Sequence, residues 1–430
     1  MELKHGVDDL PRISELLLIS IQWLMIIAPI LVIGGRIVAE LHYDNSIEKI
    51  VYMQKVFLIS GLGLILQVIF GHKLPLITGP AAVLIVGIYA ALESGYETIY
   101  TSISICGILI FLLAITGKLE IVQRIFTQNV ISLVFLLIAF SLSPLIIELL
   151  SSEDPKAWDF LFFILFTLIL IILNSRLTGF WNSILVILAM FLGSIFYHLF
   201  HTIEIEFYSS KNLEFLHFIS QTSFSPEIFL AFLLCYVALV VNDLSSMISL
   251  GKLLNVDKLE RRVRRGIMIT GLLNALSGFF GVIGPVNYAM SPGIIAVMKS
   301  ASRFALIPAG MMILLIGFSP FAISLFNAIP KAVIASIFMF ILSSQVAIAL
   351  KTMKVESIES GIVIAFPLIL CILVTFLPSE IFPLSLKPIL GNGFFLGIIL
   401  AILLEYFLVK IAKRNKFNSE ISSHGKKGDS

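Results

Sequence analysis

Long apolar runs alternate with short polar segments along almost the entire chain. The lengths of these runs, and the Gly, Pro and charged residues between them, indicate fourteen candidate membrane spans. All except the third and the tenth contain roughly 16–23 residues, about enough for a helix to cross the hydrocarbon core of a bilayer. The pattern therefore predicts an all-α polytopic membrane protein. The predicted spans are 16–35, 52–71, 80–92, 102–117, 128–149, 159–174, 179–199, 228–249, 266–283, 292–300, 304–326, 332–350, 360–377 and 391–411.

The composition excludes a water-soluble protein. Of the 430 residues, 58% are hydrophobic and 13% are charged, whereas a soluble domain has about 25% charged residues. A net charge of +2, with no basic domain outside the membrane, argues against nucleic acid as a partner. The three Cys residues fall inside apolar runs without the spacing of a metal or redox site, so no metal or other cofactor is expected. The first run is too long for a signal peptide and is expected to remain as span 1.

The Lys and Arg residues indicate the orientation of the spans, because they are enriched in cytoplasmic segments. With a cytoplasmic N-terminus, 22 of the 29 Lys and Arg residues lie in inside segments. We therefore expect a multi-pass protein of the cell membrane with both termini cytoplasmic. Residues 1–15 form the cytoplasmic N-terminus, 201–227 an extracellular linker and 412–430 a disordered, basic cytoplasmic tail.

An internal repeat divides the chain into two halves of seven spans, residues 16–200 and 228–411. The sequence PLITGPAAVLIVG (75–87) resembles GVIGPVNYAMSPG (281–293), and their Gly-Pro pairs are 205 residues apart. Because seven is odd, the second half enters the membrane from the opposite face, and the repeat is inverted. Gly/Pro-interrupted spans at matching positions of two halves indicate the midplane site of a transporter.

The interrupted spans would suit a binding site. Thr78-Gly79-Pro80 and Ser291-Pro292 are each typical of a helix start. Both half-helices would then direct free N–H groups and a positive dipole end at the membrane centre. The alternative is that these are ordinary proline kinks, which are common in membrane helices.

Span 8 carries a second group of polar residues. A stripe at helical spacing shares one of its faces: Asn242, Ser245, Ser246 and Ser249. Asp243 flanks this stripe and is the only acid of the span, and a charge at membrane depth is costly enough to indicate function. Alternatively, span 8 ends early, Asp243 lies at the cytoplasmic interface, and the serines only hold helices together.

Four segments resemble, in sequence and in order, the nucleobase–cation symporter family that contains the uracil and xanthine permeases. They are SIQWLMIIAPILV (20–32), GLGLILQVIFGHKLPLITG (61–79), LEIVQRIFTQNVISLVFLLIAFSL (119–142) and the stretch 250–303. The resemblance implies fourteen spans as seven plus seven inverted repeats. Spans 1–4 and 8–11 would form a core domain, and spans 5–7 and 12–14 a gate domain. Spans 3 and 10 would each contain a short strand before a half-helix, with the substrate between the two strands.

The resemblance also implies site residues, although the chain departs from the family pattern. Asn242 and Met290 replace the two acids of the family site, Ser246 replaces a second polar or acidic position of span 8, and Gln22-Trp23 replaces Gln-His in the first span. Each replacement removes a charge or a titrating ring. Proton coupling is assigned to Asp243. The expected substrate contacts are Gln22, Trp23, Gly79, Pro80, Ala81, Ala82, Asn242, Asn287, Tyr288 and Met290.

The predicted function is secondary active transport of a nucleobase such as uracil or xanthine, coupled to H⁺, by movement of the core against the gate. Two converging helix N-termini without the acids would instead suit an organic or inorganic anion. A binding or sensor protein that has lost transport is a further alternative. An enzyme is not expected, because no catalytic triad, metal-ligand cluster or phosphate loop appears. The resemblance implies a homodimer, and the basic run 261–265 is expected to anchor at the lipid surface.

Overall fold

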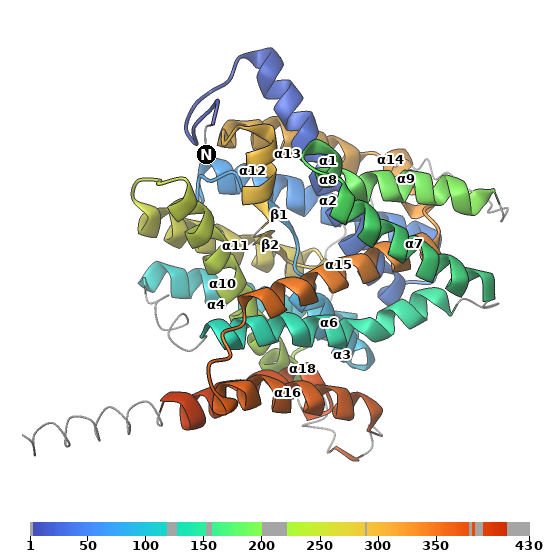
Figure 1. Cartoon of the computed structure of the whole chain (residues 1–430), viewed down its shortest axis with the longest axis vertical. Coiled ribbons are helices and arrows are strands. Elements are labelled where there is room, and N and C mark those ends of the chain that lie inside the picture. Colours follow the sequence, from blue (N-terminus) through green and yellow to red (C-terminus); the bar gives the residue numbers. More distant parts are fainter. Residues whose placement is uncertain are drawn as a thin grey trace, which may run out of the picture.

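The computed structural model describes residues 3–117, 127–151, 157–199, 222–288, 290–377, 381–382 and 390–410. The predicted tail 412–430 and most of the predicted linker 201–227 lie outside these residues. Nearly all of the described chain is helical, and two short strands, β1 and β2, lie near the centre of the molecule (Figure 1).

Each of the fourteen predicted spans corresponds to one helix or to consecutive short elements. The elements of the first half are α1 (Ile13–His42), α2 (Ser46–Ile69), β1 (Ile77–Pro80), α3 (Ala82–Ala90), η1 (Leu92–Ser94), α4 (Tyr96–Thr116), α6 (Gln128–Leu150), α7 (Ala157–Arg176), α8 (Phe180–Ser183) and α9 (Leu185–His198). Those of the second half are α10 (Pro226–Leu253), α11 (Leu259–Phe279), β2 (Pro285–Tyr288), α12 (Ser291–Met298), η3 (Arg303–Ala305), α13 (Leu306–Phe318), α14 (Pro320–Asn327), α15 (Lys331–Thr352), α16 (Ile358–Phe376), α18 (Gly393–Leu404) and η5 (Glu405–Lys410). In the described part of the chain, seven helices are individually long and apolar enough to cross a bilayer.

The eleventh span differs from the continuous helix expected over 304–326. The segment Arg303–Phe318 and helix α14 meet at an angle of 85°. The break follows from Ser319, whose hydroxyl caps α14 by accepting the Ala322 N–H at 3.2 Å, and from Pro320 in the first turn. Proline has no N–H to continue the α13 ladder but suits the start of a new helix.

Helices of one half of the chain pack against helices of the other half. Helix α4 (span 4) packs along α11 (span 9), and α2 (span 2) packs along α13 (span 11). Likewise, α1 contacts β1 and α13, while α10 contacts β2 and α4. These contacts therefore form matching pairs, as expected for inverted repeats related by a twofold axis in the membrane plane. The fold is the predicted arrangement of seven plus seven spans.

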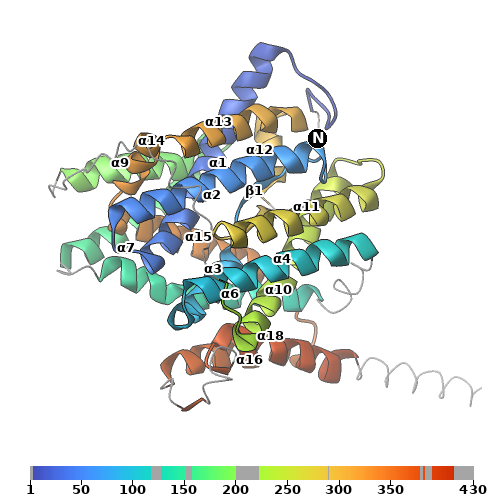
Figure 2. The ribbon, with the colours of Figure 1, turned by 180° about the vertical axis from the view of Figure 1, so that it is seen from behind.

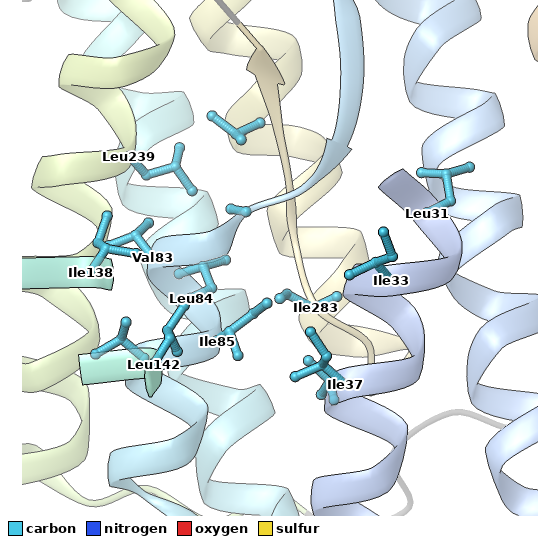
Figure 3. Close-up of a cluster of buried hydrophobic side chains, with 14 of the residues drawn as sticks. Leu31, Ile33, Ile37, Val83, Leu84, Ile85, Ile138, Leu142, Leu239 and Ile283 are labelled. Carbon is cyan, nitrogen blue, oxygen red and sulfur yellow. The ribbon is translucent and has the colours of Figure 1, made fainter. Parts of the chain in front are cut away.

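The spans form a core and a gate. Figure 2 shows α13, α2, α11 and α4 as one layer of the core, and each member contacts the next. The gate contains α6, α7, α9, α15, α16 and α18, with α15 packed against α6, α7 and α9. The core meets the gate through apolar side chains, among them Val83 of α3 beside Ile138 and Leu142 of α6 (Figure 3).

Segments predicted to be cytoplasmic meet at one end of the core. The Lys4 N–H donates to the Lys299 carbonyl at 2.7 Å, and Asp8 pairs with Arg262 of α11 at 2.9 Å and with Arg303 at 2.6 Å. Burial alone would raise the pKa of Asp8, but the hydrogen bonds from Arg303 and Arg262 hold that pKa below its usual value. This contact therefore persists at neutral pH and weakens only as the pH falls through the lowered pKa.

Glu40 lies at the opposite end, in segments predicted to be extracellular. Its carboxylate pairs with Arg36 at 2.7 Å, with Lys49 of α2 at 2.7 Å and with Lys331 of α15 at 3.2 Å. Segments assigned to the same side by their charges thus contact one another at both ends. Which end faces the cytoplasm remains a prediction.

Close contact between α4 and α11 depends on glycine. A Cβ at Gly107 would lie 2.3 Å from the Ala275 nitrogen, and one at Gly278 would lie 2.4 Å from the Ser104 nitrogen. Small residues of this kind allow helix backbones to approach closely inside a membrane, where the hydrophobic effect does not drive helix association.

We expect Gly107→Ala to destabilise the protein by about 1–3 kcal/mol, because the added methyl group meets backbone and forces the two helices apart. The measurement is thermal unfolding of the purified protein in detergent. The matched control is Gly361→Ala on α16, where the nearest atom to a new Cβ is 3.6 Å away. Equal melting temperatures for the two variants would contradict the close packing.

Candidate functional site

The two interrupted spans meet as a two-stranded antiparallel sheet. Ile77 is opposite Tyr288, Thr78 is opposite Asn287, and the pairing ends at Pro80 and Pro285. Non-helical backbone inside a bilayer is tolerated where protein satisfies its polar groups, and each strand does this for the other. The strands therefore pair directly with each other, whereas the resemblance implied a substrate between them.

Two matching turns direct the chain into the strands. After α2, Lys73 has a φ of 56°, and after α11, Gly281 has a φ of 66°, both in the left-handed region. A Cβ at Gly281 would collide with the Tyr96 ring, whose hydroxyl donates to the Gly281 carbonyl at 2.5 Å. The backbone thus reverses at corresponding points of the two halves.

Asp243 of α10 binds β2 directly. Its Oδ1 accepts the Asn287 backbone N–H at 3.1 Å and the Asn287 side-chain Nδ2–H at 2.7 Å, and its Oδ2 accepts the Thr270 hydroxyl of α11 at 2.6 Å. The Asp243 side chain is fully buried. Asp243 is therefore enclosed by protein and does not face solvent. Three donors surround this carboxylate, which is the arrangement that makes a buried acid tolerable.

The network extends into the first half of the chain. Asn287 Oδ1 accepts the Thr78 hydroxyl of β1 at 2.8 Å and lies 3.3 Å from His72 Nε2. Because His72 Nδ1 accepts the Leu74 N–H at 2.9 Å, the ring proton must be on Nε2, which then donates to Asn287. On the other side, Gln67 Nε2 donates to the Thr270 hydroxyl at 3.0 Å. One buried network therefore connects α2, β1, α10, α11 and β2.

Asn274 of α11 adds a second support for β2. Its side-chain amide donates to the Pro285 carbonyl at 2.9 Å and to the Thr270 carbonyl at 2.7 Å, while its oxygen accepts the Tyr236 hydroxyl at 2.8 Å. A Cβ at Gly284 would lie 1.8 Å from Asn274 Oδ1, so the approach of this amide requires glycine at that position.

Two predicted site residues retain free polar groups. Gln22 of α1 and Asn242 of α10 are partly exposed, and within the described residues neither side-chain amide forms a hydrogen bond. The exposed Ser245 lies one turn beyond Asn242, and Met290 at the start of α12 is 51% exposed. Helix α1 packs on β1 and α10 packs on β2, so the two amides lie on the helices that flank the sheet.

Most of the other predicted contacts are buried, while Ala82 and Tyr288 are partly exposed. Gly79, Pro80 and Ala81 are buried, whereas Ala82 at the start of α3 is partly exposed. Asn287 is buried and bonded to Asp243, Thr78 and His72, and the Tyr288 hydroxyl donates to the Pro80 carbonyl. Trp23 is fully buried, with an indole N–H that finds no acceptor in the described part of the chain. In this conformation Trp23 therefore presents no open face to a ligand.

Sequence reasoning missed His72 and Thr270 as parts of the network. A signal was present, since each is a polar residue at the end of or inside an apolar run. Their partners lie elsewhere in the chain, however, with Asn287 215 residues from His72 and Asp243 27 residues from Thr270, so no local pattern identifies them. Among the described residues, no group of three His, Cys, Asp or Glu side chains could hold a metal ion.

Comparison with known proteins gives matches along most of the chain. The model of the Permease family matches residues 14–380. The Nucleobase transporter PlUacP of Paenibacillus larvae is 27% identical over 91% of this chain and 94% of its own length. The putative purine permease YwdJ of Bacillus subtilis is 23% identical over 96% of this chain and all of its own length. A match to the putative purine permease CPE0397 of Clostridium perfringens, 26% identical, spans 43% of this chain and 42% of that protein.

Solved structures show the same fold at low sequence identity. The transmembrane domain of the cyanobacterial bicarbonate transporter BicA superposes with a TM-score of 0.61 at 15% identity, over 92% of this chain and 98% of that chain. The murine anion transporter Slc26a9 in the inward-facing state superposes with a TM-score of 0.61 at 13% identity, over 93% of this chain and 69% of that chain. These matches support the inverted-repeat fold.

We expect Asp243→Ala to lower the free energy of unfolding by about 2–4 kcal/mol, because three buried donors lose their acceptor. Thr270→Val removes a single donor and should cost less. Thermal unfolding in detergent provides the measurement. Ser245→Ala, an exposed position on the same helix, is the control and should change stability by no more than about 0.5 kcal/mol. If Asp243→Ala melts like the control, the carboxylate does not hold β2.

Proposed function

Because the chain belongs to the Permease family, we propose that it is a secondary active transporter of a nucleobase such as uracil or xanthine, coupled to protons. The family match over residues 14–380 carries this proposal. The relatives named for nucleobase or purine transport support the substrate class, and two of them align over more than nine-tenths of this chain. The protein is a multi-pass membrane permease, and its relatives are permeases, not enzymes.

The free amides of Gln22 and Asn242 suit a nucleobase. Each amide offers one acceptor and two donors, and a purine or pyrimidine edge presents both kinds of group. Neither amide must first break a bond within the described structure, so both can bind without leaving a buried partner unsatisfied. The Ala82 end of α3 and Met290 complete the proposed contacts from the two half-helices.

Asp243 is the proposed proton site. Protonation would remove the negative charge that accepts the Asn287 backbone N–H, so it would loosen the hold of α10 on β2. The Thr270 hydroxyl can rotate toward another acceptor, which allows the network to adapt without moving the helices. Proton binding at α10 would thereby reach the strand that borders the substrate site.

Alternating access requires contacts that break as the core moves against the gate. The Glu40–Lys331 ion pair joins α1 of the core to the first residue of the gate helix α15. A cavity of about 90 Å³ lies beside it, lined by Ile37 of α1 and by Leu145 and Leu149 of α6. We propose that this pair helps to close the extracellular side and opens in the outward-facing state.

An anion is the second candidate substrate. The site lacks the two carboxylates that the resemblance leads one to expect, because Asn242 and Met290 occupy those positions. The solved structures with the same fold include a bicarbonate transporter and an anion transporter. The helix N-termini of α3 and α12 would then supply the positive potential.

Uptake measurements distinguish these proposals. In a host without its own nucleobase permeases, labelled uracil, xanthine, hypoxanthine, adenine, benzoate and sulfate are offered at two external pH values. Saturable uptake of a base that increases with external acidity supports the proton-coupled nucleobase transporter. Uptake restricted to benzoate or sulfate supports the anion carrier. An absence of uptake by protein confirmed in the membrane supports a binding or sensor protein.

We expect Gln22→Ala and Asn242→Ala each to raise KM about threefold to tenfold, the effect of losing one hydrogen bond to a neutral ligand. Thermal stability should stay unchanged, since neither amide bonds within the described structure. Uptake kinetics at fixed pH give KM, and Ser249→Ala, two turns along the same helix, is the control. An unchanged KM in both amide variants would remove them from the site.

We expect Lys331→Gln to increase extracellular opening about twofold to fivefold, because a partly exposed ion pair contributes roughly 0.2–1 kcal/mol. The readout is the rate at which an impermeant maleimide labels Ile37→Cys from outside. The three native cysteines are buried, so background labelling is low. Lys49→Gln is the matched control, because Lys49 also pairs with Glu40 but lies within the core. Equal labelling in the two variants would contradict a gating role.

A further inference from the structure

A groove opens on the outer surface of the core, away from the proposed substrate site. It has a volume of about 320 Å³ and lies between the end of α2 and the beginning of α11. Its lining residues are Ile69, Phe70, Lys73, Arg265, Met268 and Ile269. Four of these are apolar and two are cationic, so the groove combines an apolar wall with a concentrated positive charge.

The two cations of the groove differ from the basic residues around them. Arg262 binds Asp8 and the Lys73 carbonyl, and Arg264 donates to carbonyl groups at the end of α4. Arg303 binds Asp8 and the Val68 carbonyl. Within the described residues, by contrast, the side chains of Lys73 and Arg265 have no hydrogen-bond or ion-pair partner. Their positive charge is available to a ligand.

The apolar part of the groove lies on the exposed side of the core, where lipid would contact it. Helices α2 and α11 belong to the outer layer of the core in Figure 2, and Phe70 is 61% exposed at the end of α2. Other side chains of this layer are also exposed and apolar, including Leu62 and Leu272. An exposed apolar surface on a membrane span is the surface that acyl chains cover.

The groove lies at one end of the spans, beside the basic run 261–265. This is the end where the N-terminal residues bind Arg262 and Arg303, and the charge pattern assigns it to the cytoplasm. Basic pockets between spans at this level are the sites where anionic lipid headgroups bind. An ordered headgroup would neutralise Lys73 and Arg265 while its acyl chains contact Phe70 and Ile269.

We propose that this groove is a specific binding site for an anionic phospholipid of the cytoplasmic leaflet. The headgroup phosphate contacts Lys73 and Arg265 together, and the acyl chains lie along α2 and α11. Because Lys73 belongs to the turn that leads from α2 into β1, the lipid binds at a structural element that positions the crossing of the strands. The proposal concerns lipid binding alone and holds whatever substrate the protein carries.

The test is lipid binding to the full-length protein, purified in a neutral detergent. Native mass spectrometry gives the apparent Kd of the tightest site for dioleoylphosphatidylglycerol, with dioleoylphosphatidylcholine as the zwitterionic comparison. The double variant Lys73→Gln/Arg265→Gln should weaken phosphatidylglycerol binding about thirtyfold, because each cation contributes about fivefold. The double variant Lys252→Gln/Lys258→Gln removes the same charge from exposed positions nearby and serves as the control. Lys258 also matches the left-handed backbone of Lys73, with a φ of 53°.

Three outcomes would overturn the proposal. They are equal phosphatidylglycerol binding by both double variants, equal binding of the two lipids by the unchanged protein, and displacement of the lipid by inorganic phosphate at equal concentration. The last outcome would assign the groove to a soluble anion. The charge-conserving variant Lys73→Arg/Arg265→Lys should bind like the unchanged protein. It separates loss of charge from damage to the fold, which thermal unfolding of every variant also reports.

Discussion

The structure depends on one requirement, which is that backbone interrupted inside a membrane must find its hydrogen bonds within the protein. Strands β1 and β2 meet this requirement by pairing with each other, and Asp243 completes it by accepting the Asn287 backbone and side-chain N–H groups. Thr270 then fixes the other carboxylate oxygen from α11. The half-helices α3 and α12 begin directly after the strands, so the direction of both helix N-termini follows from this small set of contacts.

The two halves share a backbone plan but differ in chemistry. Their packing is interchangeable, with α4 on α11 matched by α2 on α13. Yet α1, the counterpart of α10, has no acidic residue between Glu15 and Glu40, so α1 offers no carboxylate to β1 as α10 offers Asp243 to β2. The surroundings of α3 are instead apolar, as Figure 3 shows for Val83, Leu84 and Ile85. The second half therefore carries the charged interaction, and the first half supplies an apolar surface that faces α6 of the gate.

Sequence patterns predict the features that depend on local composition. The lengths of the apolar runs locate all fourteen spans, and the Gly-Pro pairs locate the two crossing strands. Both features depend only on residues that are consecutive in the sequence. The partners of Asp243 could not be predicted in this way, since Thr270 and Asn287 reach it only after three elements pack together. Trp23 and Asn287 were predicted to contact the ligand. Their burial and the hydrogen bonds of Asn287 depend on tertiary contacts, which no local pattern shows. Ser319-Pro320 has the residue types of a helix start, but the apolar residues on both sides favoured the prediction of one continuous span.

Asp243 is the only acid of α10 beyond its first turn, and its bonds constrain how the proposed site can recognise a substrate. Three protein donors already occupy Asp243, so a ligand that needed this carboxylate would have to displace Thr270 or Asn287 and leave a buried donor unsatisfied. In the proposed site, recognition would therefore fall to the neutral amides of Gln22 and Asn242 and to the positive ends of α3 and α12. Such a site favours a ligand with neutral hydrogen-bonding edges or partial negative charge over a cation. Under this proposal the carboxylate would act on the same site only through the position of β2, so the proposed proton site is separate from the proposed substrate contacts.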